Sequence, residues 1–301
     1  MYQGLTETLD GEGDVNGKKI VLPSTFIGGP RAMTQLYQDA MALVKHFRRP
    51  LLFIKITENP KWPEIQATLK GNETPSNHPH LVARVLQFNL NVLLQDLTVN
   101  KHLGTVLSYV YEIEFQKRGL PHAHIIMILA DSSIPKTVRD IDALVCAEIP
   151  NQEQENHLFS IVTKTMLYAP CEEGSHFWTN CGCKWGYPKP YAAETSISND
   201  AYPVYCRRQA SSFECGSHVY TNQDIIPYKK YLLLRYQCHA NVAIPYGIKA
   251  LKYLYKYICK GEDRSALDLE ENDETNSFVN GRYIGPSEGN YHPRTNNVLL
   301  K

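Results

Sequence analysis

The sequence lacks several features that would each indicate a definite class of protein. It contains no apolar run of membrane-spanning length, and its polar N-terminal stretch has the pattern of neither a signal peptide nor a transit peptide. No GxxxxGK[ST] or GxGxxG motif occurs, which argues against bound nucleotides, both ATP and dinucleotides. We therefore expect a globular protein of a cytosolic or nuclear compartment, with no membrane partner.

The cysteine spacing and the net charge argue against two further classes of protein. The eight cysteines match no secreted disulfide framework, so we expect free thiols. A zinc site at Cys171, Cys181 and Cys183 is a weaker alternative, because Cys181-Gly182-Cys183 is too tight for an ordinary zinc knuckle. The formal net charge is zero, with 31 basic and 31 acidic residues, which argues against a nucleic-acid binder held by bulk charge. A local basic site stays open, because a lysine-rich segment precedes the acidic stretch 262–274.

Apolar periodicity predicts a mixture of helices and strands. Five segments have the pattern of helices: 30–47, 79–99, 136–147, 153–168 and 248–260. Four segments rich in β-branched or aromatic residues have the pattern of strands: 51–57, 104–116, 120–130 and 231–244. The predicted fold class is α+β, with a central antiparallel sheet flanked by helices and a Cys-rich loop insertion.

The second and third of these strands form a predicted β-hairpin with a short turn at Lys117-Arg118-Gly119. His122 and His124 stand two apart, so both imidazoles point to one face and can share one metal ion, while Ala123 points away. An isolated His-x-His is more often a structural or surface pair. Here the neighbouring carboxylates favour a metal site.

A third ligand is expected from the preceding strand. Glu112, Glu114 and Gln116 have the parity that meets the histidine face if the turn has three residues. We favour Glu114, because a carboxylate suits Mg²⁺ or Mn²⁺. Gln116 and His239, the latter on the last predicted strand, are the alternatives.

The last predicted helix carries tyrosines and lysines at regular spacing. Tyr253 and Tyr257 are four apart and share a face, and Lys252, Lys256 and Lys260 form an adjacent row. Like charges at this spacing destabilise a helix unless an anion such as a DNA phosphate binds there. A tyrosine hydroxyl can attack a phosphodiester when lysines or a divalent metal assist it. The alternative is a helix with core tyrosines and a solvated lysine face.

These motifs resemble the replication-initiator ("helicase-like N-terminal") domain of Helitron transposons, from about residue 20 to about 286. The resemblance is carried by LPSTFIGGPRAMTQLYQDAM, LFIKITENPKWPEI, YEIEFQKRGLPHAHI, AEIP, YLLLRYQCHANV and IKALKYLYKYICKGEDR. It implies the HUH endonuclease fold, single-stranded DNA as partner, and a nuclear location. Segment 57–62 corresponds to the family's first motif, although Lys55 and Glu58 stand where the family has a Thr-rich strand.

The resemblance also implies roles for individual residues. His122 and His124 would hold the metal, and Tyr253 and Tyr257 would be nucleophiles for cleavage and transfer through a 5′-phosphotyrosine intermediate. The activity expected is that of a DNA-nicking transesterase. The alternatives are a DNA-binding module without catalysis and a decayed, inert transposon remnant.

The expected domain division has four parts. Residues 21–286 form the initiator domain, with a loop-rich insertion over 169–228, between a flexible segment 1–20 and a divergent tail 287–301. The helicase domain of the full-length family protein is expected to be missing from this chain.

Overall fold

The computed structural model describes the larger part of the chain. The described residues are 52–114, 120–169, 178–179, 182–197, 202–245, 264–266 and 280–282, with Arg31, Thr34, Gln35, Gln38 and Ala42. Those five single residues are helical, in agreement with the helix predicted over 30–47. The predictions for Gln116, Cys171, Cys181 and the whole of 248–260 lie outside the described residues.

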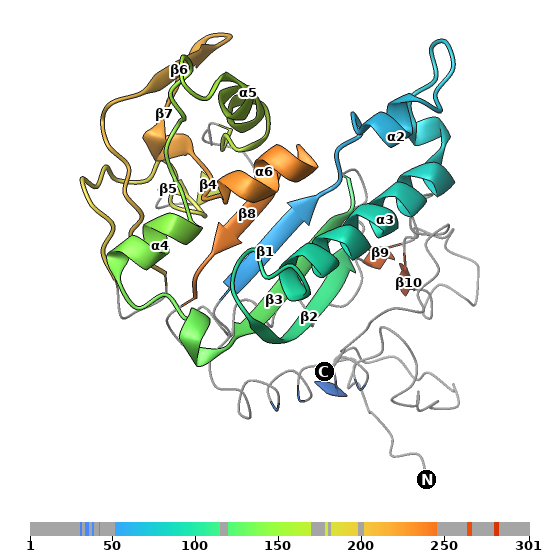
Figure 1. Cartoon of the computed structure of the whole chain (residues 1–301). Helices are drawn as coiled ribbons and strands as arrows, with labels where there is room; N and C mark the ends of the chain where they lie inside the picture. The colour runs from blue at the N-terminus through green and yellow to red at the C-terminus, as the bar shows by residue number, and fades with distance from the viewer. Residues whose placement is uncertain are drawn as a thin grey trace, which may run out of the picture.

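A four-stranded antiparallel sheet forms the centre of the fold (Figure 1). Its order is β2-β3-β1-β8, where β1 is Leu52–Thr57, β2 is Val106–Glu114, β3 is His122–Leu129 and β8 is Ala240–Ala243. The predicted hairpin is confirmed, because β2 and β3 pair antiparallel, with Glu114 opposite His122. The α+β class with a central antiparallel sheet is likewise confirmed.

Helix α3 (Pro79–Thr98) packs on one face of this sheet (Figure 1). The helix begins at a proline, which is favourable in the first turn because its missing N–H has no helical partner there. Its buried residues join Leu52, Ile54 and Ile56 of β1 in the main core. Since side chains alternate along a strand, the residues between them on β1 lie on the opposite face.

The remaining elements surround the sheet. Short helices are α2 (Pro63–Gln66), α4 (Val138–Leu144), α5 (Asn156–Thr165) and α6 (Lys230–Tyr236), with 3-10 turns at Pro75–Asn77, Asp131–Ser133 and Asn222–Asp224. Small two-stranded ladders are β4 (Trp178–Thr179) with β5 (Gly182–Cys183), β6 (Ser212–Cys215) with β7 (His218–Thr221), and β9 (Arg264–Ala266) with β10 (Asn280–Arg282). The described part of the loop-rich insertion is thus largely irregular. None of the described helices combines the length and apolar character needed to cross a bilayer.

The sequence predicts segment 231–244 as one strand, continuous or broken. This prediction is wrong for its first half, which forms α6 before β8 begins. Leu232, Leu233 and Tyr236 are buried, a spacing that fits one helical face and conflicts with strand alternation. The helix ends at Gln237, whose φ of 46° places it in the left-handed region. Because leucine and tyrosine occur in both helices and strands, the sequence of this segment did not distinguish a helix from a strand.

Candidate metal centre

Two rows of polar residues cross the sheet where β1 ends. Residues directly opposite in an antiparallel ladder share a face, so the rows follow from the strand register. The first polar row consists of Glu114, His122, Thr57 and His239. The second polar row consists of Glu112, His124, Lys55 and Asn241. His239 precedes β8 by one residue, and its carbonyl accepts a hydrogen bond of 2.9 Å from the backbone N–H of Thr57.

The polar rows lie on the face of the sheet opposite α3. Ile56 and Ala123, which alternate with them, belong to the core that includes α3. The next row along the same face is apolar and contains Phe53 and Ile126. The rings of Phe53 and His124 stack with centroids 5.9 Å apart. A polar patch therefore borders an apolar surface that fixes the orientation of one imidazole.

The two histidines are nearly excluded from solvent. His122 is 9% exposed and His124 is 3% exposed, and their ring centroids are 6.5 Å apart. Nε2 of His124 lies 3.1 Å from Oε2 of Glu114. The structure therefore brings together three residues that the sequence predicted as one site.

Burial, together with repulsion from Lys55 and His124, lowers the pKa of His122 to about 3. The ring is therefore neutral at physiological pH, which is the form that binds metals. Its Nδ1 atom has no hydrogen-bond partner among the described residues. A buried, neutral imidazole with an unused nitrogen has the chemistry of a metal ligand.

His239, the alternative third ligand, has a defined tautomer. Its Nδ1 lies 2.8 Å from the carbonyl oxygen of Thr165, which can only accept, so Nδ1 carries the proton. Burial also lowers the pKa of His239. The lone pair therefore resides on Nε2, and a backbone carbonyl of this kind often orients metal-binding histidines.

In the described part of the chain, no three His, Cys, Asp or Glu side chains already form a metal-binding group. For His122 and His124 to hold an ion with Glu114, the hydrogen bond between Glu114 and His124 must open. The residue types nevertheless fit a divalent ion, since imidazole and carboxylate both bind Mn²⁺ and Mg²⁺ accepts carboxylate readily.

Residues 1–127 match the family model described as "Helitron helicase-like domain at N-terminus". Over these residues the chain is similar to the N-terminal helicase-like domain of Helitrons. This similarity associates the chain with transposons. No curated protein matches the sequence.

The match to the Helitron-like domain ends inside β3. It includes β1, β2 and the candidate ligands His122, His124 and Glu114, but it stops before His239 and Asn241. It thus confirms the first part of the predicted resemblance, which was expected to continue to about residue 286.

Sequence reasoning missed the part that β1 and β8 contribute to the candidate metal site. Lys55, Thr57 and Asn241 join the histidines only through strand pairing. The available signal was the alternation of β1, in which Lys55 and Thr57 interrupt an otherwise apolar strand. Burial lowers the pKa of Lys55, while the negative charge of Glu114 opposes that shift.

The geometry of the two polar rows does not test the predicted zinc site or the predicted tyrosine nucleophiles. Of the three cysteines proposed for zinc, only Cys183 is described, and its Sγ lies 3.4 Å from the hydroxyl of Tyr168. The tyrosine pair and the lysine row are outside the described residues, so their distance from the histidines stays a prediction.

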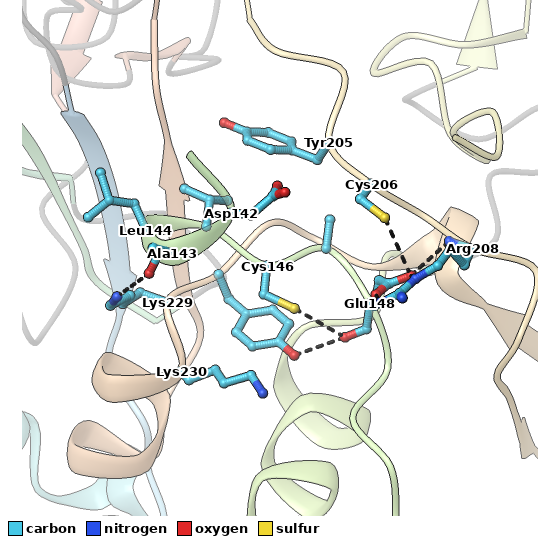
Figure 2. A pocket seen from close by; sticks show the side chains of 13 residues that line it. Asp142, Ala143, Leu144, Cys146, Glu148, Tyr205, Cys206, Arg208, Lys229 and Lys230 are labelled. Atoms are coloured by element: carbon cyan, nitrogen blue, oxygen red, sulfur yellow. Dashed lines mark hydrogen bonds and ion pairs between the residues drawn. The ribbon is translucent and has the colours of Figure 1, made fainter. Parts of the chain in front are cut away.

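A separate pocket of about 330 Å³ lies beside α4 (Figure 2). None of its lining residues belongs to either polar row. Its charged side chains are already engaged: Glu148 pairs with Arg208, and Nζ of Lys229 donates to the carbonyl of Ala143 at 2.5 Å. Cys146 and Cys206 both direct their thiols toward Glu148 (Figure 2). Because these side chains contact one another, we interpret the pocket as a structural feature and not as a ligand site.

Proposed function

We propose that this chain is a DNA-nicking and strand-transfer domain of a Helitron-type rolling-circle transposon, acting on single-stranded DNA with Mg²⁺ or Mn²⁺. The observation that carries the proposal is the first polar row, with Glu114 opposite buried His122, and His124 within hydrogen-bond distance of the same carboxylate. The family match, which includes all three residues, adds support.

His122 and His124 would hold the ion, with Glu114 as third ligand and His239 as the alternative. A divalent ion at this position supplies Lewis-acid polarisation of the scissile phosphate. The chain's own contribution is to keep the imidazole of His122 neutral and to fix both imidazoles on a strand whose other face is anchored in the core. Rigid placement of this kind reduces the reorganisation that the reaction requires.

The nucleophile would be Tyr253 or Tyr257, as the sequence pattern predicts. The tyrosine hydroxyl loses its proton as its oxygen forms a bond to phosphorus. The bond from phosphorus to the 3′ oxygen breaks, and that oxygen takes up a proton. The fragment downstream of the cut stays attached to the tyrosine through its 5′ phosphate, and the upstream fragment leaves with a free 3′ hydroxyl.

Strand transfer reverses these events with a second strand. A 3′ hydroxyl attacks the phosphotyrosine, a new phosphodiester forms, and the tyrosine oxygen leaves and regains a proton. Lys252, Lys256 and Lys260 would neutralise phosphate charge during both steps. A helicase domain in full-length family proteins would supply the single strand, and a DNA substrate would be met in the nucleus, which is the location we expect.

The test is covalent attachment. The full chain is incubated with Mn²⁺ and a labelled single-stranded oligonucleotide, and denaturing electrophoresis detects label that migrates with the protein. Tyr253→Phe and Tyr257→Phe together should abolish the adduct. Tyr255→Phe is the matched control, because it removes one hydroxyl from the same segment at a position that the predicted helix would place on a different face.

A second candidate is a single-stranded DNA-binding module without catalysis. The hydrogen bond between Glu114 and His124 favours it, since these candidate ligands satisfy each other without a metal. It predicts salt-dependent DNA binding that is unchanged by His122→Ala and by Tyr257→Phe, and no adduct under any metal condition.

A further inference from the structure

Lys55 occupies the middle of the second polar row. It lies on the central strand β1, directly opposite His124 on one side and Asn241 on the other. Its alternation with the core residues Ile54 and Ile56 places it on the histidine face.

The charge of Lys55 is poorly compensated at this place. None of the ion pairs formed within the described residues includes it. Its attractive neighbour is Glu114, whose carboxylate already contacts His124, while Lys55 disfavours the protonated forms of His122 and His239. Removing an ammonium from water without a partner is costly, so such a group is better tolerated where an anion binds.

We propose that Lys55 is a phosphate-binding residue, whose ammonium binds a non-bridging phosphate oxygen of single-stranded DNA beside the two histidines. The inference deepens the proposed function and rests on it for the identity of the ligand. A phosphodiester carries a negative charge that would compensate the positive charge of Lys55. The ammonium would donate charge-assisted hydrogen bonds to its oxygen atoms. Asn241, whose Oδ1 has no partner among the described residues, lies next to the same position.

This placement has opposite consequences for the two ligands of the site. The positive charge attracts a phosphate, but it repels a divalent cation bound at His122 and His124. Without DNA, the lysine therefore weakens metal binding; with DNA, the phosphate neutralises it. A residue with a purely structural role would not change the two affinities in opposite directions.

The experiment uses the full chain and three variants. Lys55→Gln removes the charge, Lys55→Arg keeps it, and exposed Lys70→Gln is the matched control. The affinity for a fluorescent single-stranded oligonucleotide is measured in EDTA over a series of salt concentrations. Mn²⁺ affinity is measured separately without DNA. If thermal unfolding shows that the glutamine variant is not folded, Lys55→Met repeats the comparison with an apolar side chain of similar length.

Lys55→Gln should weaken DNA binding several-fold and reduce the slope of log affinity against log salt by about 0.7. The same variant should bind Mn²⁺ more tightly than the wild type, while the arginine and control variants stay close to it. Equal DNA affinity and salt slope in Lys55→Gln and wild type would overturn the inference, as would an equal loss in Lys70→Gln. If wild type forms no covalent adduct but Lys55→Gln still loses DNA affinity, nicking fails and the role of Lys55 stands.

Discussion

Nε2 of His124 lies 3.1 Å from Oε2 of Glu114 across the β2–β3 ladder. Glu114 is directly opposite His122, so the contact to His124 is diagonal. One carboxylate thus contacts His124 and lies opposite His122, and we propose that it either pairs with His124 or binds a metal ion together with both imidazoles.

Glu114→Gln should reduce Mn²⁺ affinity by about tenfold or more, because it removes a charged ligand and the partner of His124. Isothermal titration with Mn²⁺ measures the effect. Glu64→Gln, an exposed position on α2, is the control. Unchanged affinity in Glu114→Gln with a large loss in His239→Ala would assign the third ligand to His239 instead.

Glu58 predicts a pH dependence of stability. It is 2% exposed, neither carboxylate oxygen has a partner among the described residues, and burial raises its pKa from 4.5 to about 8. Between these values the folded protein holds a proton that the unfolded chain has lost. Raising the pH through this window therefore lowers the free energy of unfolding, by at most about 1.4 kcal/mol per pH unit.

Glu58→Gln cannot lose that proton, so its unfolding free energy should fall less than that of the wild type between about pH 5 and pH 8. Urea denaturation of both proteins across this range measures the difference. Parallel pH profiles for the two proteins would show that Glu58 titrates normally.

Asp96 joins α3 to α6. It is 3% exposed and accepts hydrogen bonds from Tyr236 at 2.6 Å, Arg235 at 2.5 Å, Asn100 at 2.8 Å and Tyr231 at 3.2 Å. Burial raises the pKa of Asp96, but these hydrogen bonds outweigh burial and lower it to about 2. Asp96→Asn should therefore destabilise the fold by about 2 to 4 kcal/mol, as measured by thermal or chemical denaturation.

The control for this change is Asp131→Asn at an exposed position, which should have little effect. A loss below about 0.5 kcal/mol in Asp96→Asn would contradict the importance of this buried network. Because α6 leads into β8, the destabilised variant should also bind metal less well near its unfolding temperature.

Local patterns predicted much of the fold. Pro79 and the apolar spacing after it located α3, and alternation with a short turn located the hairpin that carries His122. The parity of Glu114 relative to the histidines followed from the same hairpin. Such features depend on residues close in sequence, where period and turn length determine the geometry.

The rest of the site depends on contacts between distant segments. Lys55 meets His124, and Asn241 meets Lys55, only after β1 and β8 enter the same sheet. No periodicity specifies which strands become neighbours. The first half of 231–244 is a related case. Leu232 and Leu233 are compatible with a helix or a strand, and tertiary packing determines which of the two forms.

The most direct test of the proposed chemistry is the Mn²⁺-dependent covalent attachment of a labelled single-stranded oligonucleotide. Wild type and Tyr255→Phe should form the adduct, whereas His122→Ala and the Tyr253→Phe, Tyr257→Phe double variant should not. Folded, Mn²⁺-bound wild-type protein that forms no adduct with a broad set of oligonucleotides would contradict the nicking function, as would an adduct that persists in the double variant.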